Sequence, residues 1–249
     1  MPKLSIITVT YNAERYLERT IRSILANGQR PEVEYLVIDG ASKDGTLGII
    51  RQYEVVIQRW ISESDRGLYD AMNKGLQAAT GEYVWFLNAG DEVHDSQVIP
   101  QLLRAIDTQQ ADVYYSDALF VNESGQPVGL RSEITPHRLP KNLTWRDMDM
   151  GMKVCHQAFI ARRIIAPQYP IDNLSADIDW EIRCLKAANK IVYLPFILCK
   201  YLTGGLSVQR HRQSLIDRFK VLATHFGTVP TLWNHARIVI RAARKRLNT

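Results

Sequence analysis

Three aspartates in this chain are placed where carboxylates can act on a phosphorylated substrate. Asp39 and Asp91 each follow a short apolar run, and Asp177 opens a segment with helical periodicity. A carboxylate can accept an N–H from a nucleobase, bind a hard cation, or take the proton of an attacking hydroxyl. Each aspartate also has an ordinary structural interpretation, because aspartate is common in turns and at helix starts.

Other polar candidates lie near these aspartates in the sequence. Arg66 and Lys74 flank a segment bracketed by glycines, and they can meet a phosphate or remain solvated surface charges. His156 and Gln157 interrupt an apolar segment, where a histidine is more often a buried core residue than a ligand. The Gly-Gly-Leu-Ser segment at 204–207 can present backbone amides to an anion.

The elements that position these residues alternate between strand and helix. We expect strands at 4–10, 34–38, 55–62 and 83–87. We expect helices after Asn12, which can cap the first of them, at 45–53, at 67–80 and after Ser96. This alternation predicts an α/β fold, a Rossmann-like αβα sandwich with a mostly parallel central sheet. Ligands bind beyond the carboxyl ends of the strands in such sheets, so Asp39 and Asp91 should face one cleft.

The second half of the chain has a different pattern. Residues 112–122 and 128–131 are predicted strands joined by a turn at 123–126, residues 132–153 are irregular, and 176–188 and 191–194 are a predicted helix and strand. None of the segments between them has the composition of a linker, which favours a single domain.

Composition favours a folded, soluble protein. The chain is 46% hydrophobic and 23% charged, which is ordinary for a globular domain. It has no apolar run long enough to span a bilayer, and its start lacks the layout of a signal peptide. We therefore expect a cytoplasmic protein whose three cysteines stay reduced.

Positive charge is concentrated near the end of the chain. Residues 218–249 contain seven Lys or Arg and no Asp or Glu, whereas residues 1–217 carry a small net negative charge. Apolar residues from Leu232 to Leu247 recur at helical spacing, which predicts a basic amphipathic helix. Such a helix suits an anionic membrane surface, although it can also pack on the body of the protein. This distribution argues against nucleic acid as a partner.

Taken together, these segments resemble the inverting family 2 glycosyltransferases of the GT-A fold, above all the bacterial members that build surface polysaccharides and lipid-linked oligosaccharides. The matching segments are 5–12, 37–46, 62–75 and 81–91. Beyond about residue 95 the likeness continues at His156-Gln157, Asp177 and the Gly-Gly-Leu-Ser segment. Asn88 and Gly90 stand where the fuller metal motif has aspartates, and Ala176 replaces a glutamate.

The resemblance implies a role for each candidate. The nucleotide would be held by Thr8, Thr10, Tyr11, Asn12, Asp39, Arg66, Asn73, Lys74 and Asn88. Asp91 would hold a divalent cation, Mn²⁺ or Mg²⁺, and Asp177 would be the catalytic base, with Asp179 as the alternative. Contacts to the acceptor or to phosphate would come from His156, Gln157, Gly204, Gly205 and Ser207.

The resemblance also implies an organisation and a location. A catalytic domain over 1–217 would have a nucleotide-sugar-binding half at about 1–110 and an acceptor-binding half at about 111–217, followed by the basic helical extension at 218–249. The donor would be a nucleoside-diphosphate sugar, UDP first and GDP next, and the acceptor a saccharide or a polyprenyl-linked sugar. The protein would sit at the inner face of the cell membrane.

Two other functions are compatible with the residues. A non-catalytic protein could bind nucleotide sugars with a degenerate metal motif. A sugar nucleotidyltransferase is less favoured, because Thr10-Tyr11-Asn12-Ala13 is not a glycine-rich phosphate loop.

Overall fold

The computed structural model describes residues 1–204 and 210–247. Its central sheet has seven strands in the order β10-β6-β9-β4-β1-β2-β3. The strands are β1 (Leu4–Thr10), β2 (Val33–Asp39), β3 (Arg59–Ser62), β4 (Tyr83–Phe86), β6 (Val113–Tyr115), β9 (Phe159–Arg162) and β10 (Ile191–Tyr193). Among these described strands β9 alone runs antiparallel to its neighbours, so the prediction of a mostly parallel sheet is confirmed.

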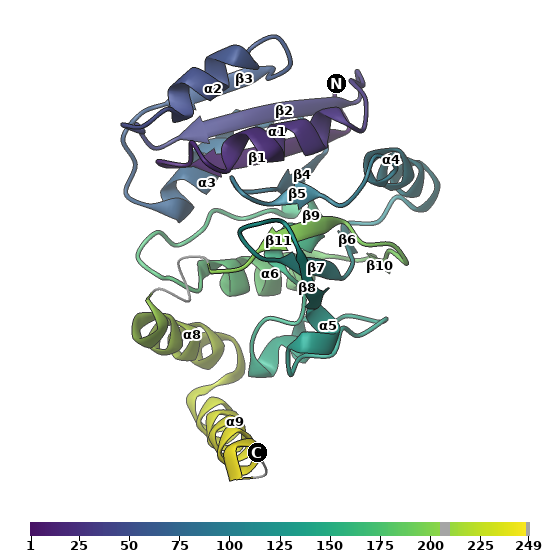
Figure 1. Ribbon diagram of the computed structural model, residues 1–249. Coiled ribbons are helices and arrows are strands. Elements are labelled where there is room, and N and C mark those ends of the chain that lie inside the picture. Colours follow the sequence, from purple (N-terminus) through teal and green to yellow (C-terminus); the bar gives the residue numbers. More distant parts are fainter. Residues whose placement is uncertain (205–209, 248–249) are drawn as a thin grey trace.

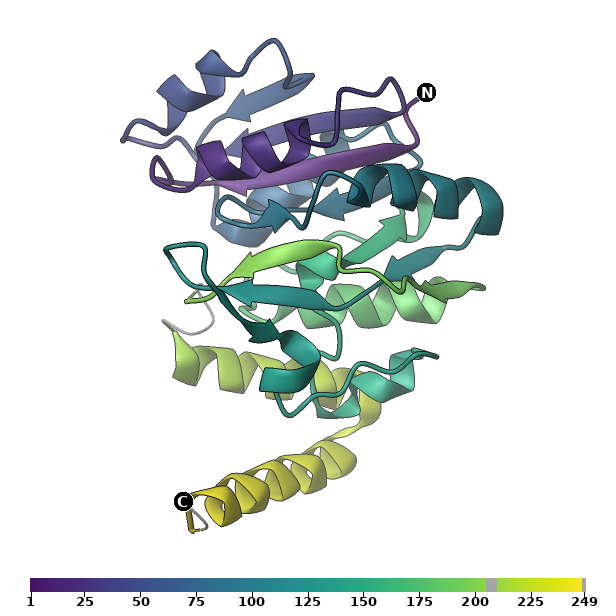
Figure 2. The ribbon, with the colours of Figure 1, turned by 45° about the vertical axis from the view of Figure 1, so that its right-hand side comes forward.

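Helices lie on both sides of this sheet. α1 (Leu17–Leu25) and α2 (Thr46–Gln52) lie on one side of β1 and β2, and α3 (Leu68–Ala78) lies on the other (Figures 1 and 2). In α1, Leu17, Ile21 and Ile24 are buried, whereas Glu18 and Arg22 pair on the outer side. This is the apolar stripe expected of a helix that covers a sheet.

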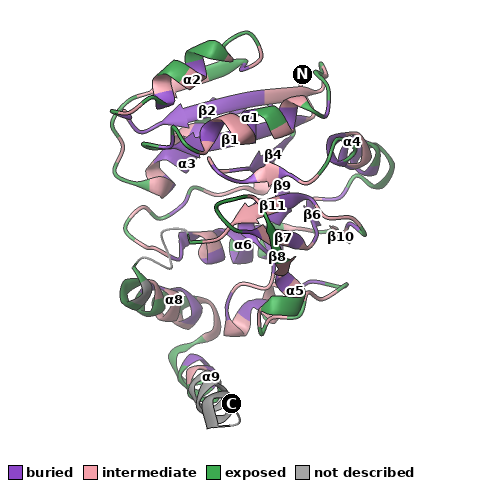
Figure 3. Ribbon diagram, in the orientation of Figure 1, coloured by how far each residue is buried: buried purple, intermediate pink, exposed green. Residues whose placement is uncertain are grey.

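The central strands of the sheet are buried on both faces, which explains their apolar sequences. All seven residues of β1 and all four of β4 are buried, as expected for strands covered on both faces. Figure 3 shows this buried layer running through β1, β2 and β4. Phe86 of β4 contacts Trp180 edge-on, with ring centroids 6.0 Å apart, which joins the sheet to the helix that carries Asp177.

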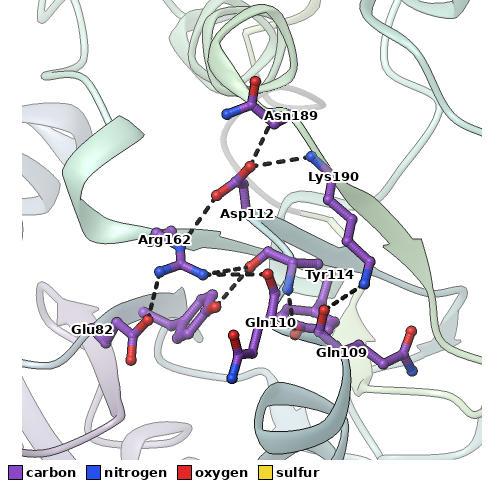
Figure 4. Close-up of polar contacts among 10 residues, drawn as sticks. Glu82, Gln109, Gln110, Asp112, Tyr114, Arg162, Asn189 and Lys190 are labelled. Carbon is purple, nitrogen blue, oxygen red and sulfur yellow. Dashed lines mark hydrogen bonds and ion pairs between the residues drawn. The ribbon is translucent and has the colours of Figure 1, made fainter.

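A polar cluster holds the antiparallel strand β9 in register at one end (Figure 4). Arg162 pairs with Glu82 beside β4 (2.7 Å) and with Asp112 beside β6 (3.2 Å). Asp112 also accepts backbone hydrogen bonds from Asn189 and Lys190, just before β10. Two carboxylates and one guanidinium therefore connect four neighbouring strands.

A second, four-stranded sheet has the order β5-β11-β7-β8. Its strands are β5 (Glu92–Val93), β7 (Ala118–Val121), β8 (Pro127–Leu130) and β11 (Cys199–Leu202). The predicted hairpin at 112–131 is present as β7 and β8, but its first strand was predicted too long. The segment divides at Ser116 and Asp117, because β6 pairs in the central sheet and β7 pairs in the second one.

The segment predicted as irregular contains short helices. α5 (Arg131–Ile134) and the 3₁₀ helix η1 (Trp145–Met150) lie within or beside 132–153. Two further 3₁₀ turns, η2 (His156–Ala158) and η3 (Arg163–Ile165), flank β9. The remaining helices are α4 (Val98–Gln109), α6 (Ala176–Ala187), α8 (His211–Phe226) and α9 (Thr228–Leu247).

α8 and α9 form the end of the chain (Figure 1). α8 packs on α6 and η1, and α9 packs on η1 and α8. The boundary expected between residues 217 and 218 therefore falls inside α8. Among the described helices, none is long and apolar enough to cross a membrane.

Candidate active site

Asp39 connects the carboxyl ends of the parallel strands β2 and β3 through its hydrogen bonds. Its Oδ2 accepts hydrogen bonds from the Ser42 amide (3.0 Å) and from the Ser62 hydroxyl at the end of β3 (2.6 Å). Its Oδ1 accepts from the Ser42 hydroxyl. A carboxylate offers about four lone-pair positions, so one position on Oδ1 is left for a ligand. The Asp39 side chain is fully buried. Its hydrogen bonds to Ser42 hold the turn after β2, which is the structural role expected of an aspartate at this place.

Tyr11 and Asp65 cover the Asp39 region. A side chain at Gly40 would collide with the Asp65 carboxylate and approach the Tyr11 ring, so it would force the Asp65 side chain to shift. The Tyr11 ring itself is 64% exposed. Asn12 lies beside it with φ 47° and accepts a hydrogen bond from the Lys43 amide.

Asn12 therefore does not cap the following helix. α1 begins at Leu17, with Tyr16 in the cap position and no side-chain cap hydrogen bond. Asn12 instead joins the loop after β1 to the loop after β2, through Lys43 and through its own amide, which donates to Ser42.

Two orphaned polar atoms lie at neighbouring strand ends. The Thr10 hydroxyl, at the end of β1, is buried and has no hydrogen-bond partner among the described residues. The same is true of Asn88 Oδ1, just after β4, the strand that pairs with β1. Buried polar atoms without partners are uncommon and mark places where a ligand or water belongs. Thr8 differs, because its hydroxyl donates to the Leu87 carbonyl within the core.

Asp91 is buried in a turn stabilised by α1. Its Oδ1 accepts a hydrogen bond from the Leu202 amide of β11 (2.8 Å), while Arg19 and Thr20 donate to the Gly90 and Asp91 carbonyls. Burial raises the pKa of Asp91 to about 7, although the Leu202 amide and the Arg19 charge act in the opposite direction. A cation beside this carboxylate would favour its ionised form.

Asn88 and Asp91, which follow β4, have side-chain oxygens that could bind a divalent cation. Within residues 1–204 and 210–247, no group of three or more His, Cys, Asp or Glu side chains is arranged to hold a metal. Hard cations take about six or more oxygen ligands. The unpartnered Asn88 oxygen and the Asp91 carboxylate thus fit a cation that draws its other ligands from phosphate and water.

The residues from the α3 segment divide between surface and core. Arg66 is exposed and pairs with Asp70 (3.4 Å), and Lys74 pairs with Glu63 (2.9 Å), so both cations lie near the end of β3. Asn73 is buried and exchanges two hydrogen bonds with the backbone of Tyr169. These two hydrogen bonds of the Asn73 side chain connect α3 to the loop before α6.

Asp177 and Asp179 have opposite surroundings although they are two residues apart. Asp177 is half-buried, and burial raises its pKa to about 6, against the effect of hydrogen bonds from the Ile178 amide and Tyr69. Asp179 binds His225 (2.7 Å) and Arg183 (3.2 Å). Burial would raise the pKa of Asp179, but these two hydrogen bonds outweigh it and lower that pKa. The raised pKa of Asp177 and its lack of an ion pair with a described residue suit it better than Asp179 for accepting a proton.

The structure brings Asp177 close to the strand-end residues. Tyr69, in the first turn of α3, donates a hydrogen bond to the Leu174 carbonyl (3.2 Å) just before α6 and also interacts with Asp177. Tyr201 of β11 lies within electrostatic reach of both Asp91 and Asp177. The motif at 62–75, the Asp91 turn and the start of α6 therefore border one region.

Of the remaining residues predicted from the sequence, His156 and Gln157 are not exposed at the surface of this region. His156 and Gln157 are buried in η2, with exposures of 4% and 6%, so the core interpretation describes their surroundings. Gly204 is exposed with φ 96°, and Gly205 and Ser207 lie outside the described residues. Glu181, which sequence reasoning missed, is fully buried one turn after Asp177.

A separate cavity of about 600 Å³ lies away from these residues. It is lined by the end of α1 and by α4, including Asn27, Arg30 and Arg104. None of the aspartates described above borders it.

The chain matches the model of glycosyl transferase family 2 over residues 5–166, which is more than half of its length. That range contains Thr10, Asp39, Asn88 and Asp91, and Asp177 follows it by eleven positions. The chain therefore belongs to glycosyl transferase family 2 and is a glycosyltransferase.

Individual proteins agree with this assignment. The chain is 29% identical over 225 residues to the PGL/p-HBAD biosynthesis glycosyltransferase of Mycobacterium bovis, covering 83% of this chain and 79% of that protein. The crystal structure of S. aureus TarS 1–349 in complex with UDP-GlcNAc has a TM-score of 0.72 and 21% identity, covering 89% of this chain and 66% of that one. The mannosyltransferase PcManGT of Pyrobaculum calidifontis, in complex with GDP-Man and Mn²⁺, has a TM-score of 0.63 and 17% identity, covering 98% and 75%. The structural likeness establishes a common GT-A fold.

Proposed function

We propose that this chain is an inverting glycosyltransferase that moves a sugar from a nucleoside-diphosphate sugar to a hydroxyl of a saccharide or lipid-linked acceptor, in the synthesis of a surface polysaccharide. The observation that carries the proposal is the setting of Asp177. It is half-buried beside Tyr69, its pKa is raised to about 6 by burial, and, unlike Asp179, it has no ion pair with a described residue. Such a carboxylate is ionised at neutral pH and still basic enough to accept a proton.

The reaction would be a single displacement. Asp177 takes the proton from the acceptor hydroxyl while the acceptor oxygen forms a bond to the anomeric carbon. The bond between that carbon and the diphosphate oxygen breaks, and its electron pair leaves with the nucleoside diphosphate. Because attack occurs opposite the leaving group, the configuration at the anomeric carbon inverts.

Donor binding would use the strand ends. The exposed Tyr11 ring can stack on a base, and the spare position on Asp39 can accept an imino N–H once Tyr11 and Asp65 move aside. The orphaned Thr10 and Asn88 atoms would bind polar groups of the donor. UDP-GlcNAc in TarS and GDP-Man in the archaeal enzyme support UDP first and GDP next as the nucleotide.

A divalent cation, Mn²⁺ or Mg²⁺, would be held by Asn88 and Asp91 together with the donor's diphosphate. When bound, it would neutralise the charge of the leaving group. The Mn²⁺ in the archaeal mannosyltransferase structure supports this choice of cofactor. Arg66 and Lys74, near the end of β3, would add positive charge for the phosphates.

The helical extension supports a peripheral position at the inner face of the cell membrane. Val229, Leu232 and Trp233 of α9 are 77%, 55% and 68% exposed, and Ile216 of α8 is 53% exposed. Residues 218–249 add seven basic and no acidic side chains. Apolar and cationic groups together suit an anionic bilayer surface. The protein should sediment with anionic vesicles at low salt, and failure to do so would contradict this placement.

A non-catalytic, donor-binding function is the second candidate. It is favoured by Asn88 and Gly90, which stand where the fuller metal motif has aspartates. The two candidates differ in chemistry, because both would bind the nucleotide but only the enzyme would release it from the sugar.

One experiment separates them. Thermal unfolding with UDP, GDP, dTDP and CMP, each with and without Mn²⁺, identifies the nucleotide, since a ligand at about a hundredfold its Kd adds about 2.7 kcal/mol of stability. Release of that nucleotide from its sugar donors is then measured, and NMR gives the anomeric configuration of the free sugar. We expect release with inversion. Binding without release would favour the second candidate.

A further inference from the structure

Glu181 is a buried carboxyl group that the reaction above does not use. It lies in α6 one turn after Asp177, so both side chains project from the same face of the helix. Asp177 is half-buried, whereas Glu181 is 0% exposed. α6 itself lies between the central sheet and α8 (Figure 1).

The carboxyl oxygens of Glu181 have no hydrogen bond to any described residue. The imidazole Nδ1 of His156 is 3.7 Å from Oε1 and is also without a hydrogen bond. An ionised carboxylate here would lose its hydration without compensation. Burial and, after it, the charge of Asp177 raise the pKa of Glu181 well above its usual value. A fully buried carboxyl group whose oxygens lack hydrogen-bond donors among the described residues favours its protonated form.

His156 is the acceptor that this proton faces. Burial lowers the pKa of His156 to about 3, so its ring is neutral and has one donor and one acceptor nitrogen. Nε2 lies 3.0 Å from the Tyr169 hydroxyl. With the ring hydrogen on Nε2, Nδ1 accepts from protonated Glu181. A small side-chain movement closes the 3.7 Å separation to hydrogen-bond distance.

These contacts lead back to the base. The Tyr169 ring stacks on Tyr69 with centroids 5.6 Å apart. Tyr69 in turn interacts with Asp177 and donates to the Leu174 carbonyl. Glu181, His156, Tyr169 and Tyr69 therefore form a continuous set of contacts behind Asp177.

We propose that Glu181 is a positioning residue of this enzyme: as a neutral carboxyl group it fixes His156 and Tyr169 behind α6 and leaves Asp177 as the single negative charge on that face of the helix. This inference rests on the proposed function, in which Asp177 is the base. Ionisation of Glu181 would place a second negative charge one turn from Asp177 and deprive His156 of its donor. Sugar transfer should therefore decline as pH rises through the pKa of Glu181.

Other ionisable groups also face Glu181. They are Asp177 and Cys184 of α6, Cys155 and His156 near η2, Tyr169, and Arg131 of α5. Arg131 is the cation of this set, and its guanidinium donates to the carbonyls of Met152 and Lys153. Because a thiol or phenol can also titrate at high pH, the test must change Glu181 itself.

The first test is the pH dependence of donor hydrolysis by the full chain. Glu181→Gln keeps the shape and a donor for His156 but cannot ionise, so its acid limb should match the wild type while its alkaline limb moves up by about one pH unit or more, or disappears. Glu181→Met removes the donor and should lower kcat about tenfold with little change in donor KM. The exposed carboxylate of Glu123, changed to Gln, is the matched control.

A Glu181→Gln profile that superimposes on the wild type at both limbs would overturn the proposal. A second readout does not depend on catalysis. The pKa of Glu181 is raised in the folded state, so the wild type should lose stability relative to Glu181→Gln as pH rises through that value. If wild type hydrolyses no donor but this loss is seen, the proposed function fails and the assignment of Glu181 as a neutral buried group stands. Parallel stability curves overturn the inference whatever the activity.

Discussion

Asp91→Asn is expected to stabilise the unliganded protein at alkaline pH while abolishing its response to a cation. Asparagine has nearly the same shape and its Oδ1 can still accept the hydrogen bond from the Leu202 amide, so the substitution removes charge and little else. Asp91 titrates at about pH 7 in the folded chain because it is buried, whereas an aspartate in an unfolded chain titrates near about 3.9.

The direction of the change in stability with pH follows from the number of protons that the folded and unfolded chains bind. Between these two values the folded state holds a proton that the unfolded chain has released, so stability falls as pH rises. From pH 5 to pH 8 the wild type should lose about 2.7 kcal/mol relative to Asp91→Asn, at about 1.36 kcal/mol per pKa unit. For a chain of this size that is a difference in Tm of about 5–10 °C.

The assay is thermal or urea unfolding at several pH values, with Glu123→Gln as a control for loss of an exposed carboxylate. At pH 7.5, Mn²⁺ with the bound nucleotide should raise the Tm of the wild type and not that of Asp91→Asn. If the wild type and Asp91→Asn keep a constant stability difference from pH 5 to pH 8, Asp91 is not the buried titrating group described here. An equal response to Mn²⁺ would remove it as a ligand.

Three further outcomes follow from the same site. Asn88→Asp restores a charge of the fuller metal motif, so the Mn²⁺ concentration that gives half-maximal stabilisation in the presence of nucleotide should fall about tenfold. An unchanged concentration would show that residue 88 does not bind the cation. Tyr11→Ala removes an exposed ring and should weaken nucleotide binding about tenfold by calorimetry, whereas Tyr53→Ala, away from the strand ends, should not. Leu232→Ser with Trp233→Ser should reduce sedimentation with anionic vesicles and leave nucleotide binding intact; undiminished sedimentation would assign membrane contact to another surface.

The order of strands and helices in the first half could be read from the sequence because β1 and β4 are covered on both faces. Such strands appear as short apolar runs, and β1 and β4 are buried along their whole length. The division of 112–122 into β6 and β7 could not be read, because both parts are apolar and the break depends on which sheet each joins.

In the candidate site, the sequence indicated which side chains are polar but not which of them are already hydrogen-bonded within the protein. Thr8 and Asn73 have polar side chains near the motifs. The Thr8 hydroxyl, however, donates to the Leu87 carbonyl, and the Asn73 amide is hydrogen-bonded to the backbone of Tyr169. Sequence spacing could have placed Glu181 on the face of Asp177, since they are four residues apart in a predicted helix. Its burial depends on packing against His156, which no local pattern encodes.

The assignment of the base is the central claim, and one comparison tests it most directly. Release of nucleoside diphosphate from the preferred donor is measured for wild type, Asp177→Asn and Asp179→Asn, together with the Kd for the donor. Asp177→Asn should lower kcat about a thousandfold with donor Kd nearly unchanged, since a general base contributes about 10²–10⁴-fold. Asp179→Asn, whose carboxylate is bound by His225 and Arg183, should keep most of the activity. Full turnover by Asp177→Asn, or its loss in Asp179→Asn alone, would contradict this account.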